Sequence, residues 1–201
     1  MECKKNVETL IFEHRPGLRL TQKYTMKSLP CFLLLSGGGQ NTGKTTLGCL
    51  IVERLCLSNA VYVLKVSPHL HDPGPALPAI AWGEGFMIYE ETQIDTTKDS
   101  SRYLAAGAER VYFITCQRSQ LGKAIKEALK LIPPGVPVVC ESGGLAEFYK
   151  PGLHVHLAAE HAAKTPSSAP DVLFWFDGKG FEPNPDGIFW DNHRWVFKAR
   201  R

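Results

Sequence analysis

The sequence predicts an α/β protein: a three-layer α/β/α domain with a mainly parallel sheet and an antiparallel C-terminal hairpin. Three observations support this class. Short apolar segments alternate with amphipathic segments, an order that gives parallel strands joined by right-handed crossovers. A glycine-rich turn separates the first apolar segment from the first helical segment. Aromatic residues and turn motifs crowd together in residues 171–201.

The elements are expected in a regular order. The first helix, at 43–57, is apolar almost all round and should be clamped between the sheet and other structure. A short helix at 100–108 is expected to be capped by Asp99 and stopped by Gly107. A third helix is marked by one apolar face made of Leu121, Ala124, Ile125, Ala128 and Leu129. Strands are expected at 31–35, 60–66, 110–116, 136–141, 153–157 and 171–176, and the first is apolar on both faces, as in a buried strand of a parallel sheet.

Three segments have less regular patterns. Residues 67–85 are rich in Pro and Gly and are expected to form an irregular loop with a functional or mobile role. Residues 86–90 could continue the sheet or form an edge hairpin. The aromatic residues near the C-terminal end favour an antiparallel hairpin with its own small core over an aromatic binding surface.

The length of 201 residues suits one domain, which we place at 31–201 after an N-terminal arm or hairpin at 1–30. The net charge of +3 is small, and acidic and basic residues are interspersed, which argues against nucleic acid as the main partner. No apolar stretch approaches the ~18 residues of a membrane span. The six cysteines form no CxxC pair and suit a reducing compartment, so we expect a cytoplasmic protein.

The stretch from Cys31 to Thr46 predicts a phosphate-binding loop. Gly38, Gly43, Lys44 and Thr45 have Walker A spacing between a strand and a helix. Backbone amides of such a loop and the helix N-terminus surround phosphate, the lysine reaches the terminal phosphates, and the hydroxyl binds Mg²⁺. The alternative is a chance match in a glycine-rich turn. The expected binding residues are Gly38, Gly39, Gln40, Asn41, Thr42, Gly43, Lys44, Thr45 and Thr46.

A second acidic partner is expected at the end of a neighbouring strand. Glu141 follows the apolar segment 136–140, and ligands bind at the carboxyl ends of strands in open parallel sheets. We therefore expect Thr45 and Glu141 to hold Mg²⁺, with a simple turn acid as the alternative reading of Glu141. Lys65 closes another strand, and its ammonium could point at the phosphates or extend to solvent.

The sequence has two HxH pairs, His69 with His71 and His154 with His156. If a pair lies on a strand, its two histidines point to the same face. A transition-metal site is conceivable there. No cysteine or acid stands at a matching spacing, so surface or substrate-contacting histidines are the default interpretation.

The order of these motifs resembles the MobB-type molybdopterin-guanine dinucleotide biosynthesis adaptors, a family of P-loop NTPases in the group of signal-recognition and MinD-like proteins (the SIMIBI group). The resemblance covers roughly residues 31–157, and the hairpin motif HRWVFKA is similar more loosely. It is carried by SGGGQNTGKTTL at 36–47, LKVSPHLHDPG at 64–74, KDSSRYLAAGAERV at 98–111 and the strand ending at Glu141.

The resemblance implies binding of a guanine nucleotide with Mg²⁺, slow or partner-dependent hydrolysis, a homodimer, and service to a molybdopterin guanylyltransferase-type enzyme. It also implies that Asp99 and Arg102 lie near the active loop. We take Lys44, Glu141 and Asp99 as candidate catalytic residues. The residues themselves leave ATP and GTP open, because no N/TKxD motif is present.

Three functions remain open at this point. The first is a nucleotide-dependent adaptor with weak NTPase activity, in which hydrolysis switches a partner surface. The second is a P-loop small-molecule kinase, with Asp72 or Asp99 as candidate base. The third is a binding module that holds a phosphorylated ligand without catalysis.

Overall fold

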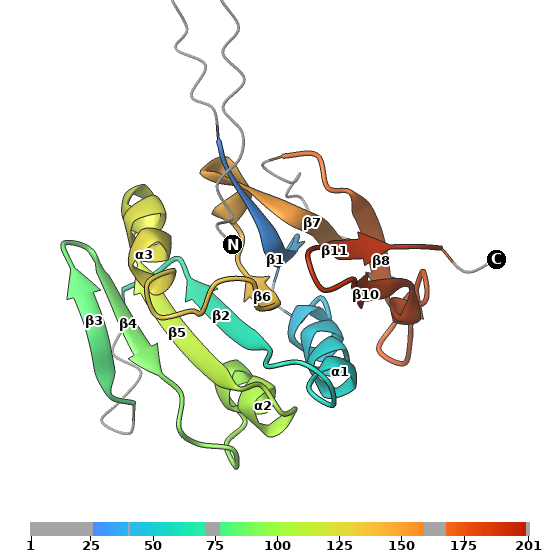
Figure 1. The fold of residues 1–201 in the computed structure, drawn as a ribbon, viewed down its shortest axis with the longest axis horizontal. Helices are drawn as coiled ribbons and strands as arrows, with labels where there is room; N and C mark the ends of the chain where they lie inside the picture. Colours follow the sequence, from blue (N-terminus) through green and yellow to red (C-terminus); the bar gives the residue numbers. More distant parts are fainter. Residues whose placement is uncertain (1–25, 40, 71–76, 159–167, 200–201) are drawn as a thin grey trace, which may run out of the picture.

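The computed structural model describes residues 26–39, 41–70, 77–158 and 168–199. A nine-stranded mixed sheet runs through the molecule in the order β3-β4-β5-β2-β6-β1-β7-β8-β9, and β10 and β11 form a separate antiparallel hairpin (Figure 1). The strands from β5 to β8 in this order pair in parallel, whereas the pairs β3–β4, β4–β5 and β8–β9 are antiparallel. The prediction of an α/β protein with a mainly parallel sheet is confirmed.

The bounds of the elements follow the predicted segments closely in the middle of the chain. The strands are β1 (Lys27–Gly37), β2 (Tyr62–Ser67), β3 (Ala79–Gly83), β4 (Phe86–Glu90), β5 (Arg110–Cys116), β6 (Val138–Glu141), β7 (Tyr149–Ala158), β8 (Val172–Phe176), β9 (Phe181–Glu182), β10 (Ile188–Trp190) and β11 (Trp195–Phe197). The helices are α1 (Lys44–Leu55), α2 (Asp99–Ala105) and α3 (Leu121–Ala128), with 3₁₀ turns at Arg118–Gln120, Leu145–Glu147 and Pro185–Gly187.

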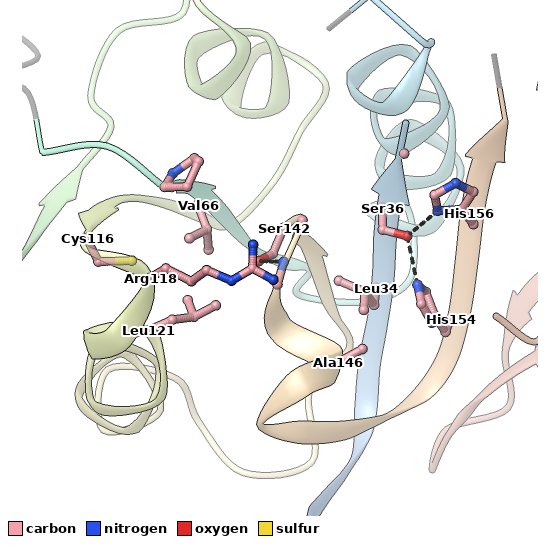
Figure 2. Close-up of a pocket in the computed structure, with 14 residues that line it drawn as sticks. Leu34, Ser36, Val66, Cys116, Arg118, Leu121, Ser142, Ala146, His154 and His156 are labelled. Atoms are coloured by element: carbon pink, nitrogen blue, oxygen red, sulfur yellow. Dashed lines mark hydrogen bonds between the residues drawn. The ribbon is translucent and has the colours of Figure 1, made fainter. Parts of the chain in front are cut away.

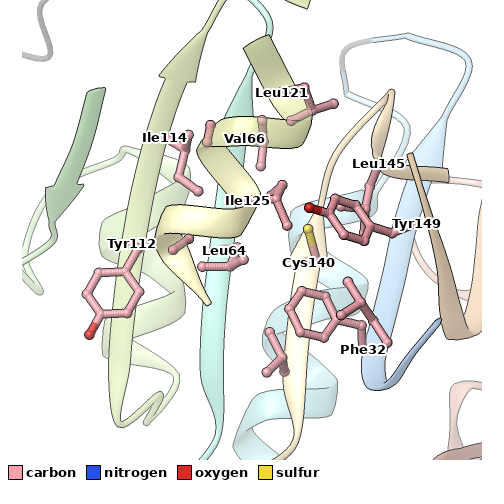
Figure 3. Packing of buried hydrophobic residues seen from close by; sticks show 14 of the residues in the cluster. Phe32, Leu64, Val66, Tyr112, Ile114, Leu121, Ile125, Cys140, Leu145 and Tyr149 are labelled. Carbon is pink, nitrogen blue, oxygen red and sulfur yellow. The ribbon is translucent and has the colours of Figure 1, made fainter. Parts of the chain in front are cut away.

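Helices cover both faces of the sheet. On one face, buried side chains of α1 and α2 pack on alternate residues of the central strands, as Ile51 and Tyr103 do with Val63. On the other face, Ile125 of α3 packs on the residues between, such as Leu64 (Figure 3). Since strand side chains alternate between faces, the apolar strands supply both cores. This explains why a strand such as 31–35 is apolar throughout rather than alternating.

Two expectations about local structure are wrong, and a third holds. Residues 67–85 are not irregular throughout, because β3 pairs with β4 as an antiparallel edge hairpin, and cross-strand pairing outweighs the Pro and Gly content nearby. Asp99 does not cap α2: it is the first helical residue, no side chain caps this end, and its carboxylate pairs with Lys65 instead. Gly107 does follow α2, with φ at 93°, a conformation that favours glycine.

The C-terminal hairpin does not pack a core of its own. Ile188 of β10 and Trp195 of β11 are buried in the same core as α1 and α2. The indole nitrogen of Trp195 donates a hydrogen bond to the carbonyl oxygen of Cys31 at 2.7 Å. The hairpin therefore closes the α1 face of the sheet beyond β7 (Figure 1).

Some predictions concern residues outside those described. Residues 1–25 of the predicted arm belong here, and β1 already begins at Lys27. In the part of the chain that the structure describes, no helix has the length and apolar character needed to span a membrane. Cys49, Cys56, Cys116 and Cys140 are free thiols.

Candidate phosphate and magnesium site

The candidate site begins with the loop between β1 and α1. Gly43 occupies the N-cap of α1 with φ at 84°, and a Cβ there would lie 2.8 Å from the ring of Phe176. Both facts require glycine at this position. Asn41 also has a positive φ, 57°, which Asn tolerates better than most residues. The loop therefore turns sharply into α1, and α1 begins at Lys44 with its free amides toward the loop.

Lys44 lies over this loop. Its ammonium donates hydrogen bonds to the carbonyl oxygen of Gly39 at 2.6 Å and to the hydroxyl of Thr42 at 2.9 Å. Burial lowers the pKa of Lys44, the charge of Lys65 adds to the shift, and the charge of Glu141 opposes it. A lysine held by the loop itself stands where phosphate oxygens can replace the loop oxygens as acceptors.

Glu141 is the centre of the site. It ends β6, which lies between β1 and β2, and its neighbours in register are Leu35 and Lys65. Glu141 is buried, with only 4% of its surface exposed to solvent. One carboxylate oxygen accepts hydrogen bonds from the hydroxyls of Thr45 at 2.9 Å and Tyr103 at 3.1 Å, and the other accepts from Lys65 at 2.5 Å. A buried carboxylate with this many donors is held in one orientation.

Lys65 joins Glu141 to a second acid. Its ammonium lies 2.7 Å from a carboxylate oxygen of Asp99, the first residue of α2. Burial opposes the charge of Lys65, but Glu141 and Asp99 outweigh it and raise the pKa of Lys65. For Asp99, burial acts to raise the pKa, and the hydrogen bond and charge of Lys65 outweigh it, so the pKa is lowered. Lys65 and Asp99 are therefore both charged at neutral pH.

Two further residues connect α2 with α1. Arg102 lies 3.7 Å from Asp99 and donates a hydrogen bond to the hydroxyl of Thr46 at 3.3 Å. Tyr103 reaches Glu141 over Gly48 of α1, where a Cβ would lie 2.2 Å from the phenol oxygen. Burial raises the pKa of Tyr103 and the charge of Glu141 adds to this, so the phenol remains a hydrogen-bond donor.

The donor set fits Mg²⁺ held jointly with phosphate. The hydroxyl of Thr45 and the carboxylates of Glu141 and Asp99 are hard oxygen ligands of the kind Mg²⁺ prefers. Among the described residues, no group of three or more His, Cys, Asp and Glu side chains could hold a metal alone. Mg²⁺ commonly binds through one or two carboxylates, water and substrate phosphates, so such a group is not required.

A cavity of about 380 Å³ lies at the same edge of the sheet, on the α3 face (Figure 2). We call it the edge pocket. Its polar end is formed by Ser36, His154 and His156, all buried. The hydroxyl of Ser36 is 2.7 Å from Nε2 of His154 and 2.9 Å from Nδ1 of His156. Of the default interpretation, surface or substrate-contacting histidines, the surface alternative is wrong for this pair, because both residues are buried.

The structure thus brings together most of the predicted site residues. Lys44, Thr45, Glu141, Lys65 and Asp99 converge, and Thr46 and Arg102 join them through a hydrogen bond. Gln40, His71 and Asp72 lie outside the described residues, so the His69 and His71 pair and the base role of Asp72 remain predictions.

Sequence reasoning missed Tyr103 and Ser36. Tyr103 lies in the motif 98–111 that carries the resemblance, but nothing local indicates that it reaches Glu141, which is 38 positions away. Ser36 precedes the glycine-rich turn, and the register of β1 with β7 places it opposite His156. Only knowledge of the strand order could have revealed either contact.

Comparisons of the chain with protein-family models, with curated proteins and with solved structures found no match. The site itself is therefore the basis for assigning a function.

Proposed function

We propose that this protein binds a purine nucleoside triphosphate with Mg²⁺ at the loop 38–45 and slowly transfers the terminal phosphoryl group to water. One observation carries the proposal: Thr45, Glu141 and Lys65 converge beside Lys44 at the carboxyl edge of the sheet. Phosphates and Mg²⁺ require this combination of an anion cradle with oxygen ligands for a cation.

Each part of the site has a separate task in this proposal. The amides at the start of α1 and the ammonium of Lys44 bind phosphate oxygens. The Thr45 hydroxyl and the carboxylates of Glu141 and Asp99 would hold Mg²⁺, which would supply positive charge beside the phosphate oxygens. Lys65 and Tyr103 keep Glu141 in place.

The wider role rests on the resemblance to the MobB-type family. On that basis we propose a P-loop NTPase of the SIMIBI group that prefers GTP to ATP. It acts as a homodimeric adaptor for a molybdopterin guanylyltransferase-type enzyme. Nucleotide binding would change the contacts of Asp99 and Arg102, since both are linked to the loop side chains, and α2 would carry this change to a partner surface.

The experiment that tests the proposal is titration calorimetry of the purified chain with GTP and ATP, with Mg²⁺ and with EDTA, followed by assay of phosphate release. Binding that requires Mg²⁺, with slow release of phosphate, is expected. Thr45→Val should weaken the Mg²⁺ dependence, whereas Thr92→Val, away from the loop, should not. Binding that is equal with and without Mg²⁺ would contradict the assignment of Thr45 and Glu141.

A small-molecule kinase is the second candidate, and the edge pocket favours it. A hydrolase needs only water beside the terminal phosphate, whereas this chain has a cavity next to the loop.

A further inference from the structure

The edge pocket has the size and shape of a small-ligand site. Its volume of about 380 Å³ falls within the range of ~300–1,000 Å³ typical of small-molecule pockets. Side chains of Leu34, Val66, Leu121 and Ala146 form its apolar walls, and the cluster of Ser36 and the two histidines forms its polar end (Figure 2). A ligand with an apolar body and one polar group matches this division.

The charges around the pocket favour an uncharged ligand. Arg118 is the one charged side chain among its described lining residues, and it forms two hydrogen bonds with the carboxylate of Glu147, one of them 3.2 Å long. Burial lowers the pKa of His154, and burial together with the charge of Lys44 lowers the pKa of His156. Both imidazoles are therefore neutral near pH 7, and no net charge remains to attract an ion.

The hydrogen bonds at the polar end can leave one nitrogen of a pocket-lining imidazole without a proton. Ser36 has one proton to donate, so at least one imidazole must donate to Ser36, and the other can accept from it. In one of the two directions, Nδ1–H of His156 donates to Ser36 and Ser36 donates to Nε2 of His154. Nε2 of His156 then carries a lone pair and no proton.

His156 also lies beside the phosphate loop. Ser36 is followed by Gly37, the last residue of β1, and the amide of Gly38 donates a hydrogen bond to the carbonyl of Leu157 at 3.3 Å. The charge of Lys44 reaches His156 strongly enough to lower its pKa further after burial has done so. His156 thus lines the edge pocket and adjoins, through Leu157, the residue that begins the phosphate loop.

We propose that the edge pocket binds a phosphoryl acceptor, an uncharged small alcohol with an apolar body, and that His156 accepts the proton of its hydroxyl group. This inference rests on the proposed nucleotide site. The hydroxyl oxygen forms a bond to the γ-phosphorus, and the bond from that phosphorus to the β,γ-bridging oxygen breaks. The electron pair leaves with the nucleoside diphosphate, and the hydroxyl proton moves to Nε2 of His156. Ser36 and His154 are positioning residues that set the tautomer.

The test uses the full chain with MgGTP or MgATP and two probes, 3-phenyl-1-propanol and 1,6-hexanediol. Formation of a phosphate monoester is followed by ³¹P NMR, and the histidine ring signals are followed in ¹⁵N-labelled protein. We expect a monoester, a shift of the His156 signals on adding the alcohol, and an unprotonated Nε2. His156→Gln should lower the rate of ester formation at least ~100-fold, the typical contribution of a general base, without changing nucleotide affinity.

Two controls make the result specific. His193→Gln alters an exposed histidine in the turn between β10 and β11 and should change neither rate nor affinity. The methyl ether of 3-phenyl-1-propanol has no hydroxyl group and should shift the ring signals without forming an ester.

The proposal is overturned if the chain binds nucleotide but neither alcohol forms an ester or shifts the ring signals. It is also overturned if His156→Gln forms ester at the wild-type rate. Calorimetry of the wild-type chain separates these outcomes from failure of the nucleotide site, because absence of nucleotide binding defeats both proposals at once.

Discussion

Two clusters of polar residues lie at the same edge of the sheet, and they differ in charge. On the α1 face, Lys65 forms ion pairs with Glu141 and Asp99, and the ammonium of Lys44 is hydrogen-bonded to the loop. On the α3 face, Ser36, His154 and His156 are buried and neutral. β1 lies between the two clusters. Its consecutive side chains point to opposite faces of the sheet, so the clusters lie on different faces. Binding phosphate and Mg²⁺ requires charge, whereas accepting a proton from an alcohol requires an uncharged base, so the two clusters suit two halves of one reaction.

The largest expected effect comes from removing the charge at the centre of the α1 face cluster. Glu141→Gln should lower the free energy of unfolding by about 3 kcal/mol. It removes one of the two carboxylates that pair with the largely buried ammonium of Lys65 and leaves Asp99 as the other. Urea denaturation measures this loss. Glu147→Gln, which removes the partner of exposed Arg118, should cost under ~1 kcal/mol. Equal losses in the two variants would contradict the central role given to Glu141.

The matching change on the α3 face should affect stability without affecting nucleotide binding. Ser36→Ala removes two hydrogen bonds and leaves two buried imidazoles without their shared partner, so it should cost about 2 kcal/mol. Denaturation gives the stability and calorimetry the affinity, with Ser58→Ala as an exposed control. A large loss of nucleotide affinity in Ser36→Ala would show that the two clusters do not act separately.

A smaller effect is expected where a neutral donor meets the charged cluster. Tyr103→Phe removes a hydrogen bond to the carboxylate of Glu141 and should cost about 1.5 kcal/mol, since the acceptor is ionised. Tyr112→Phe removes a hydrogen bond to the carbonyl of Leu131 and should cost about 0.5 kcal/mol. If denaturation gave the reverse order, the distinction between charged and neutral acceptors would fail.

The smallest effect is a dependence of stability on pH. The pKa values of His154 and His156 are lower in the folded chain than in the unfolded chain, so the unfolded chain binds more protons as the pH falls below about 6.5. The free energy of unfolding should therefore fall between pH 7.5 and pH 5.5. In the double variant His154→Gln/His156→Gln this fall should be smaller, and an identical fall would show that other groups cause it. Denaturant midpoints at pH 7.5 and pH 5.5 measure the fall in the free energy of unfolding.

Much of the fold could be predicted because its signals are local. An apolar strand such as 110–116 coincides with β5, and the face marked from Leu121 to Ala128 is the buried face of α3. The candidate site was also largely predictable, because glycines and a lysine at fixed spacing describe one loop. The rule that ligands gather at the carboxyl ends of parallel strands then placed Glu141 beside it.

The remaining features depend on contacts between distant segments. Tyr103 reaches Glu141 only because α2 packs over Gly48, and no local pattern contains that fact. Likewise, Ser36 bridges the histidines only in the register that pairs β1 with β7. β3 forms in a segment of unfavourable composition because β4 offers it a partner. Tertiary pairing decides these cases, and a single sequence does not display it.

The most direct test of the nucleotide site is titration calorimetry of Lys44→Ala against the wild-type chain, with MgGTP and MgATP. Lys123→Ala, an exposed lysine of α3, is the matched control. We predict that the wild-type chain and the control bind alike, while Lys44→Ala binds ~10- to 100-fold more weakly, the value of a lost hydrogen bond between charged groups. Unchanged affinity in Lys44→Ala would contradict the assignment of loop 38–45 as the phosphate site.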